Sequence, residues 1–212
     1  SEVYLKIKLD LLALPGVKAV VTGQDSPTRL GLYLKDRFIF AYDRVRYVGE
    51  SVAGVVAVSE ESAERAVGLV RVKYEALPPA FDPYEAAQPD APLIHPDLGS
   101  YEVVNFIFPK PGTNISEHFK LRKGDVDGAW AQCADIVEGT YSLPQIQHAP
   151  IETHVAVARW DLSGDVTLWA ASQSPFAQRD ILSQSLGIPH GNLRVVSPYV
   201  GGGFGGKAGI SI

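Results

Sequence analysis

The sequence is poor in sulfur. It contains no methionine and a single cysteine, Cys133. One cysteine cannot form an internal disulfide, and it cannot supply the ligand set of a zinc or iron–sulfur site. We therefore expect a reducing compartment and no metal ion held directly by side chains of this chain.

Features of membrane and nucleic-acid proteins are also missing. No apolar run reaches the roughly 18 residues of a membrane span, and the first residues show no basic-then-apolar signal pattern. The formal net charge is −5, from 19 basic and 24 acidic side chains. Non-specific nucleic-acid binding needs a basic surface, so we predict no nucleic-acid partner. We expect a soluble, cytoplasmic protein.

The composition that remains is that of a globular chain. Hydrophobic residues make up 46% and charged residues 20% of the 212 residues, enough for a sizeable core. Strand-like and helix-like segments alternate in both halves, which predicts α/β layers, and we assign the whole chain to the α+β class. Prolines accumulate between Leu77 and Thr113, and proline disfavours regular structure. We predict domains at 1–82 and 119–212, joined by an extended connector at 83–118.

The first half shows strand and helix signals. We predict a strand–turn–strand from Val3 to Val21 around Leu14-Pro15-Gly16. A long strand is expected at 46–58, with an irregularity at Gly49-Glu50-Ser51. Ser59 is a helix cap followed by acidic residues and an amphipathic face. A strand is expected to follow at 70–74.

The second half predicts further helices. Asp125 would cap a helix whose apolar face, over residues 126–133, buries Cys133 as a small apolar side chain. A second helix would begin at Ser174-Pro175, run to Leu186 and end at Gly187. Strands are expected at 135–141, 154–160, 165–171 and 193–197.

Five of the six residues from 201 to 206 are glycine. Glycine loses much backbone entropy on ordering, so such a run is costly unless the backbone adopts φ > 0 or approaches a ligand. Exposed backbone N–H groups in such loops bind anions or acceptor groups. A flexible linker is the plainer alternative, although a preceding strand and Phe204 within the run argue against it.

Two nucleotide-binding patterns fit the loop weakly. Gly201, Gly203 and Gly206 match G-x-G-x-x-G, but the given sequence ends before the position, about 20 residues later, where an acidic residue is expected. Gly201, Gly206 and Lys207 match most of the P-loop pattern G-x-x-x-x-G-K-[ST], but Ala208 replaces the hydroxyl residue that binds magnesium. A nucleotide-binding module therefore remains an alternative.

A third interpretation is a resemblance. Residues 200–207 resemble the glycine-rich molybdopterin loop of the molybdenum hydroxylase family, which includes xanthine dehydrogenase and aldehyde oxidoreductase. Further stretches resemble family segments in the same order: residues 14–17 with 21–23, 45–53 and 72–78 (an α/β hammerhead domain), then 124–127 and 147–152 (entry to a molybdopterin-binding α/β domain) and 169–176 (the segment that reaches the metal).

This resemblance implies an oxidoreductase that hydroxylates an aldehyde or an aromatic or N-heterocyclic carbon with oxygen from water. The implied cofactor is molybdopterin, as Mo-molybdopterin cytosine dinucleotide or Mo-molybdopterin. Electrons would pass to [2Fe-2S] clusters and usually FAD on partner subunits or domains. The implied assembly contains the remainder of the molybdopterin subunit, an iron–sulfur subunit and an FAD subunit, as a dimer of heteromers.

The resemblance also implies roles for individual residues. Gln173 resembles the glutamine whose amide hydrogen-bonds an oxygen ligand of molybdenum; an amide donates without titrating. The cofactor-binding loop would comprise Gly202, Gly203, Phe204 and Gly205, with the ring of Phe204 packed as a plug beside the site. Ala208 lies in the substrate pocket, where purine-oxidising relatives carry a glutamate, so a purine substrate is not expected.

His148 and Glu152 have the four-residue spacing of one helical face, but Pro150 lies between them. We expect them to support structure or a substrate channel rather than catalysis. No residue matches the family's catalytic base, so we assign no catalytic residue and expect the isolated chain to be inactive. A non-catalytic assembly fragment is the remaining alternative.

Overall fold

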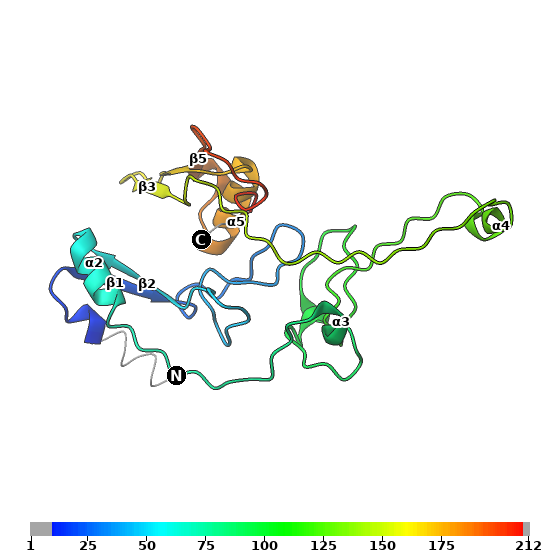
Figure 1. Ribbon diagram of the computed structural model, residues 1–212. Helices are drawn as coiled ribbons and strands as arrows, with labels where there is room; N and C mark the ends of the chain where they lie inside the picture. The colour runs from blue at the N-terminus through cyan, green and yellow to red at the C-terminus, as the bar shows by residue number, and fades with distance from the viewer. Residues whose placement is uncertain (1–9, 210–212) are drawn as a thin grey trace.

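The computed structural model describes residues 10–209 and contains two small sheets, with a long excursion of the chain between them (Figure 1). Both helices and strands are present, which confirms the α+β class. In chain order the elements are β1 (Val17–Thr22), β2 (Ala53–Ala57), α2 (Glu60–Val67), α3 (Pro83–Ala86), the 3₁₀ turn η1 (Leu98–Ser100), α4 (Val126–Trp130), β3 (Ala156–Trp160), β4 (Val166–Ala170), α5 (Pro175–Leu186), the 3₁₀ turn η2 (His190–Asn192) and β5 (Leu193–Val196).

The first sheet is an antiparallel pair, β1 and β2, covered by α2. The hydroxyl of Ser59 accepts a hydrogen bond from the backbone N–H of Ser62, which confirms the predicted helix cap. Ala66 of α2 packs with Val20 of β1 and with Leu11 in a small core cluster. Apolar alternation on the strand and the apolar face of the helix thus produce one common core.

The second sheet contains the parallel strand pair that positions the candidate site. β3 pairs antiparallel with β4, and β4 pairs parallel with β5. α5 connects the two parallel strands, since a parallel pair needs a crossover. Val166, Leu193 and Ile188 form its buried cluster. The expected strands near 154–160, 165–171 and 193–197 are confirmed at β3, β4 and β5.

The ends of α5 lie where the sequence predicts them, although Ser174 at the N-cap position makes no side-chain capping hydrogen bond. Pro175 is its first residue, where the missing N–H leaves no broken helical bond. Gly187 ends the helix in the left-handed conformation, at φ 66°. The hydroxyl of Ser183 donates to the carbonyl of Ile188 at 2.6 Å and closes the turn that leads into β5. These contacts fix where the chain re-enters the sheet.

Several expected strands of the first half are not observed. Residues 46–50 form a turn, because Glu50 accepts from the backbone N–H of Arg46 at 2.5 Å and Gly49 has φ 93°. The predicted strand 46–58 is therefore shortened to β2. Residues 70–74 find no partner strand within the described range and stay irregular. Of the predicted segment 3–21, residues 3–9 lie outside the described residues, and residues 10–12 are helical.

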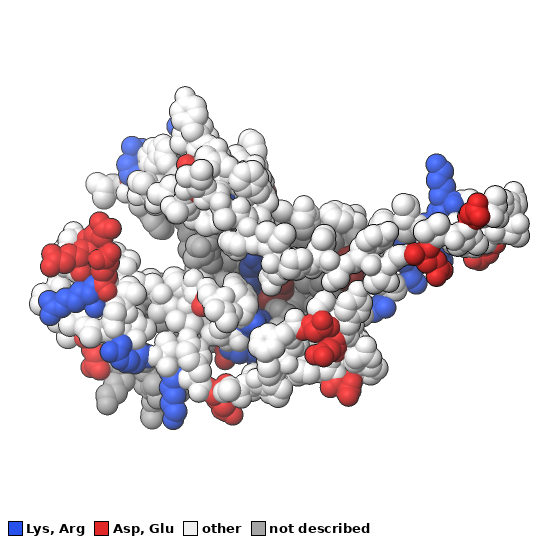
Figure 2. All heavy atoms as spheres, viewed as in Figure 1, with Lys and Arg blue, Asp and Glu red and all other residues white. Residues whose placement is uncertain are grey.

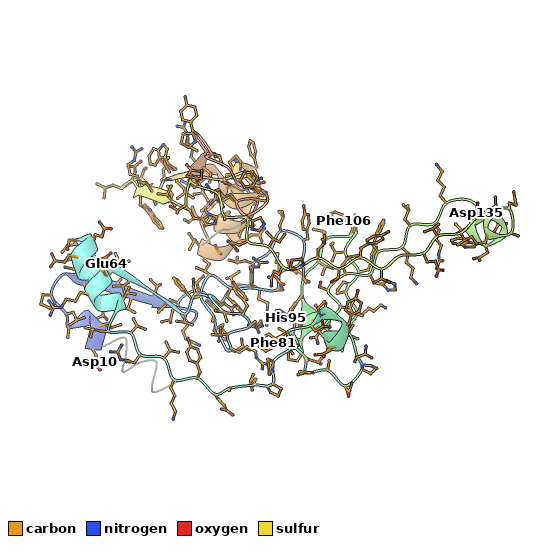
Figure 3. All side chains as sticks on the ribbon, viewed as in Figure 1. Asp10, Glu64, Phe81, His95, Phe106 and Asp135 are labelled. Atoms are coloured by element: carbon orange, nitrogen blue, oxygen red, sulfur yellow. The ribbon has the colours of Figure 1, made fainter. Side chains whose placement is uncertain are left out.

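The excursion between the sheets ends in an arm whose tip carries α4 (Figure 1). Asp125 caps α4 as predicted, accepting from the N–H of Gly128. The two segments of the arm are extended but pair with no strand among the described residues, so the strand expected at 135–141 is not formed. Asp135 lies at the tip of the arm (Figure 3). Cys133 is exposed, so its predicted burial is wrong, because α4 packs on no other described element.

Charged side chains are spread over the face of the molecule seen in Figure 2, with basic and acidic groups interspersed. An acidic group lies over α2, where Glu60 and Glu61 occupy the first helical turn. Among the described residues, no helix has both the length and the apolar character needed to cross a membrane.

Candidate functional site

The candidate site lies beyond the carboxyl ends of β4 and β5. Because these strands are parallel, the segments that follow them leave from the same edge of the sheet. Gln173 follows β4 and precedes α5, and residues 201–207 follow β5. The topology therefore brings the predicted glutamine and the predicted glycine loop together, although they are about thirty positions apart in the sequence.

Gln173 is fastened to the glycine loop by three hydrogen bonds. Its side-chain Oε1 accepts from the backbone N–H of Gly205 and of Lys207, each at 3.1 Å. Its own N–H donates to the carbonyl of Lys207 at 2.9 Å. Two N–H donors on one amide atom identify that atom as the oxygen. The side-chain NH₂ group is thus left without a partner among residues 10–209, and the residue is exposed.

The loop backbone adopts conformations that favour glycine. Gly202 and Gly205 have φ 90° and φ 93°, and Phe204 between them has φ 51°. Gly203 is buried against Gln173, and a Cβ on it would lie 2.3 Å from the Oε1 of that side chain. The glycine at 203 is therefore required by close packing, and those at 202 and 205 by backbone conformation.

Three consecutive N–H groups of the loop have no partner within the described residues: those of Gly202, Gly203 and Phe204. The neighbouring N–H groups are all used, by Glu152, by Gln173 or by turns within the loop. Gly202, Phe204 and Gly205 have positive φ, and turns of this kind can present successive backbone N–H groups to an anion. The loop can therefore donate to an acceptor-rich ligand.

Glu152 and Lys207 form an ion pair at the base of the loop. The Lys207 side chain is fully buried, and its Nζ donates to Oε2 of Glu152 at 2.5 Å. The same oxygen accepts from the N–H of Gly201 at 2.8 Å. The Lys207 ammonium, followed by the Gly201 N–H, holds the pKa of Glu152 below its usual range.

This pairing was not part of the predicted site. The sequence predicts that Glu152 and His148 support structure or a channel, and Lys207 has a predicted role only through a weak match to the P-loop pattern. Glu152 contacts the loop itself, so it belongs to the site. His148 packs on the loop, with ring atoms 3.2–3.3 Å from where a Cβ of Gly206 would stand. The motif at 147–152 was a signal for Glu152, but nothing in the sequence indicated that Glu152 would contact Lys207.

Phe204 and Ala208 border the loop. The ring of Phe204 is 74% exposed, so the predicted packed plug is wrong for the described residues, because the left-handed backbone at Phe204 leaves its side chain at the surface. Ala208 is half-buried, and its N–H donates to the carbonyl of Gly205 at 3.2 Å. A methyl side chain at this position presents no polar group to a ligand.

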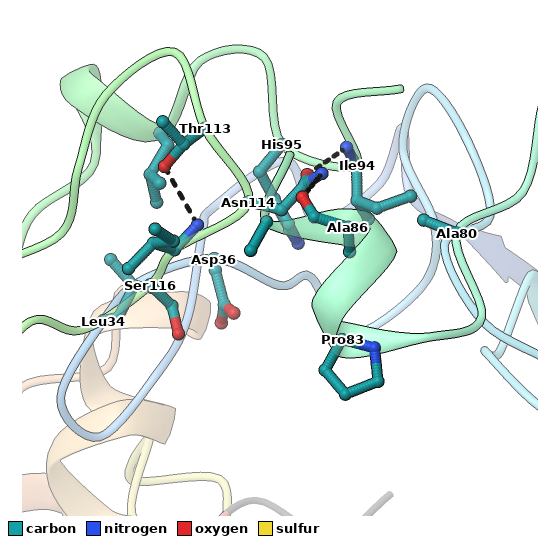
Figure 4. Close-up of a pocket in the computed structure, with 13 residues that line it drawn as sticks. Leu34, Asp36, Ala80, Pro83, Ala86, Ile94, His95, Thr113, Asn114 and Ser116 are labelled. Carbon is teal, nitrogen blue, oxygen red and sulfur yellow. Dashed lines mark hydrogen bonds between the residues drawn. The ribbon is translucent and has the colours of Figure 1, made fainter. Parts of the chain in front are cut away.

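The described residues contain no cluster of three or more His, Cys, Asp or Glu side chains that could hold a metal ion. A separate cavity of about 390 Å³ lies beside α3 (Figure 4), and none of its lining residues belongs to the glycine loop. Asn114 bridges its walls: its NH₂ group donates to the carbonyls of Ala86 and Pro92, and its oxygen accepts from the N–H of Ile94. This bridge holds the connector together.

Two family models match this chain and together cover most of it. Residues 6–78 match the α/β hammerhead domain of aldehyde oxidase and xanthine dehydrogenase. Residues 107–212, which include the glycine loop and Gln173, match the molybdopterin cofactor-binding domain.

Relatives in bacteria match nearly the whole chain. It is 35% identical over 199 residues to a probable xanthine dehydrogenase subunit of Bacillus subtilis, covering 93% of this chain and 25% of that protein. It is 32% identical over 211 residues to the nicotinate dehydrogenase large molybdopterin subunit of Eubacterium barkeri, covering 97% and 46%. This chain thus spans about a quarter to a half of these relatives.

Solved structures share the fold. Reconstituted CO dehydrogenase from Oligotropha carboxidovorans superposes with a TM-score of 0.78 at 31% identity, covering 96% of this chain and 26% of that one. Quinoline 2-oxidoreductase from Pseudomonas putida 86 gives a TM-score of 0.73 at 29% identity, covering 94% and 25%.

These matches define the class as proteins that bind the molybdopterin cofactor. The chain belongs to the molybdenum hydroxylase family of xanthine dehydrogenase and aldehyde oxidoreductase, in the molybdopterin-binding large subunit. The resemblance predicted from the sequence motifs, including the hammerhead fold of the first part and the molybdopterin cofactor, is confirmed.

Proposed function

We propose that this chain forms part of the cofactor-binding subunit of an oxidoreductase that hydroxylates an aldehyde or an aromatic or N-heterocyclic carbon with oxygen from water. The observation that supports this proposal is the set of unpaired donors in the loop. The N–H groups of Gly202, Gly203 and Phe204 have no partner among residues 10–209, and neither does the NH₂ group of Gln173.

The residues present fit a molybdopterin cofactor. A cofactor rich in oxygen, sulfur and ring-nitrogen acceptors can be held by neutral hydrogen-bond donors, and the loop offers backbone and amide donors of this kind. The buried ammonium of Lys207 is already paired with Glu152, so it does not compete for the ligand. When bound, the molybdenum cofactor supplies the redox chemistry, and the protein supplies binding and orientation.

Each site residue then has a defined task. Gln173 would donate through its NH₂ group to an oxygen of the cofactor while the loop holds its Oε1. The backbone of residues 202–204 would donate to the acceptor edge of the bound group, and Gly205 would orient Gln173. A donor fixed in advance needs no reorganisation during the reaction, which is how such groups lower a barrier.

The partners and the domain limits stay proposals. We propose that the chain acts with the remainder of its molybdopterin subunit, with an iron–sulfur subunit carrying [2Fe-2S] clusters and with an FAD subunit, as a dimer of heteromers. The boundaries at 82 and 118, the cytoplasmic location and the inactivity of the isolated chain stay predictions from the sequence.

A nucleotide-binding module is supported less well. The P-loop interpretation needs a lysine free to reach a phosphate, whereas Lys207 is fully buried and bonded to Glu152. The hydroxyl that would bind magnesium is replaced by Ala208. Equilibrium binding of ATP or NAD to the native protein would be required to revive this alternative.

The test uses the native complex that contains this chain. We expect molybdenum by elemental analysis, and a fluorescent pterin after acid oxidation, both in stoichiometric amounts with this subunit. Mass spectrometry of the intact complex would identify the co-purifying subunits. A fully assembled complex without pterin would contradict the proposal and would favour a role in assembly alone.

A further inference from the structure

One carboxylate holds both ends of the glycine loop. Oε2 of Glu152 accepts from the N–H of Gly201, where the loop begins, and from the Nζ of Lys207, where it ends. The carboxylate comes from a distant segment, since Glu152 precedes Lys207 by 55 positions. The loop is therefore closed into a ring by a side chain from outside it.

The backbone of Lys207 also forms two hydrogen bonds with Gln173. The N–H of Lys207 donates to Oε1 of Gln173, and its carbonyl accepts from the N–H of Gln173. A continuous chain of hydrogen bonds thus leads from the carboxylate of Glu152, through the side chain and backbone of Lys207, to the amide of Gln173. A displacement at Glu152 would be transmitted to the amide that faces the site.

We propose that Glu152 and Lys207 are positioning residues, whose ion pair holds the glycine loop and the amide of Gln173 in the geometry that retains the molybdopterin cofactor. This inference rests on the proposed function of the loop. Neither side chain is expected to touch the cofactor: the Nζ of Lys207 is directed to Glu152, and Oε2 of Glu152 is bonded at the base of the loop.

The energetics of the pair favour a single geometry. The Lys207 side chain is 0% exposed, whereas 32% of the Glu152 side chain is exposed. A buried ammonium is strongly disfavoured without a partner, so Lys207 stays in place only while the carboxylate is there. The pair therefore makes the closed loop the stable form and makes an open loop unfavourable.

The experiment compares variants of the full-length subunit in its native complex. Glu152→Gln keeps an oxygen for the N–H of Gly201 but removes the negative charge. Lys207→Met removes the positive charge at similar length. The double variant removes both charges, so no buried ammonium is left alone. Lys35→Met with Glu102→Gln is the matched control, because that ion pair is exposed at Glu102 and far from the loop in sequence.

Two measurements are made on each variant: the amount of molybdenum and pterin retained per subunit, and the thermal unfolding midpoint. We expect Glu152→Gln to lower both. We expect the double variant to regain most of the midpoint, because replacing a buried ion pair by neutral groups is often tolerated. Its retained molybdenum and pterin should stay well below the wild-type amounts, since removing groups that support a metal site typically lowers affinity by roughly 10- to 100-fold.

The outcomes separate the two proposals. A wild-type complex that contains no pterin contradicts the proposed function. A wild-type complex that contains pterin, together with a double variant that retains it equally well, overturns the positioning role and leaves the pair as packing alone. Loss of cofactor in the double variant at a near-normal midpoint, with the Lys35 and Glu102 control unchanged, supports the inference.

Discussion

Gln173 and Lys207 meet in two hydrogen bonds although 34 positions separate them. The side-chain oxygen of Gln173 accepts from the backbone N–H of Lys207 at 3.1 Å, and the backbone N–H of Gln173 donates to the carbonyl of Lys207 at 2.9 Å. The orientation of the amide is therefore set by main chain rather than by a flexible side chain. The acceptor half of the amide is used internally, and the donor half is free.

This division of the amide predicts a difference between two substitutions. Gln173→Glu keeps oxygens for the N–H groups of Gly205 and Lys207 but removes the NH₂ donor, whereas Gln173→Ala removes both functions. In the complete enzyme both are expected to lower kcat by ~10²–10³, the usual cost of one positioned donor at a reacting centre.

The thermal midpoint should separate the two variants, with Gln173→Ala lower because the N–H groups of Gly205 and Lys207 lose their acceptor. An unchanged kcat in Gln173→Glu would show that the NH₂ group takes no part in the reaction. Circular dichroism is the control that the fold is intact.

A methyl group at position 203 should damage the site more than the fold. In Gly203→Ala the new Cβ would stand 2.3 Å from Oε1 and 2.6 Å from Cδ of Gln173. The backbone at 203 suits alanine, so the strain falls on the Gln173 side chain, which must move. We expect loss of bound molybdenum with a small change in thermal midpoint.

Gly191→Ala is the matched control, because no atom lies within 4 Å of a Cβ at that position. It should retain the wild-type content of molybdenum. Equal retention in Gly203→Ala would mean that the amide of Gln173 can be displaced without consequence.

The stability contributed by Glu152 should depend on pH. Its pKa is held below the usual value of 4.5, first by the Lys207 ammonium and then by the Gly201 N–H. A carboxylate of this kind stabilises the folded state fully above its usual pKa, and the contribution is lost as the pH falls through the lowered value.

The measurement is the difference in thermal midpoint between wild type and Glu152→Gln, from about pH 7 down to about pH 3. The difference should be largest at the neutral end and should close in acid, where the wild-type carboxylate becomes protonated and resembles the amide. A difference that is constant with pH would show that the charge is not what matters.

Ala208 leads to a prediction on substrate class. Its side chain has no hydrogen-bonding group, and a site without such groups cannot reproduce by shape the discrimination that they provide. We expect steady-state kcat/KM of the whole complex to favour small aldehydes or nicotinate-like rings over xanthine. A clear preference for xanthine would show that a polar group elsewhere in the complex takes the place of a side chain at 208.

Local signals predicted α2, α4 and α5, but not α3, which lies within the segment 83–118 where no regular structure was expected. Ser59 and Asp125 act as caps and Gly187 as a stop because each effect depends on hydrogen bonds or conformations within a few residues. The strands were predicted less well in the first half and on the arm. Residues 70–74 and 135–141 have apolar, β-branched character, but a strand also needs a partner, and none lies beside them in the described range.

In the site, too, local features were predicted from the sequence and a long-range contact was not. The glycine run and Gln173 were recognised from motifs that stay within a few positions, and their contact follows from the parallel pairing of β4 and β5. The pairing of Glu152 with Lys207 could not be derived, because it joins an irregular segment to a loop across 55 positions. The sequence shows that Glu152 and Lys207 are present, but it does not show that their side chains are close in the folded chain.

Two non-glycine residues of the described chain have positive φ, Ala149 at 43° and Phe204 at 51°, and both border the site. Conformations of this kind cost of order 1–3 kcal/mol each, and they persist where the surroundings enforce them. Glycine at either position would relieve the strain but would also give the unfolded chain more freedom. The two effects on thermal stability therefore oppose each other, so relieving this strain gains little heat resistance while it changes the backbone that borders the cofactor-binding loop.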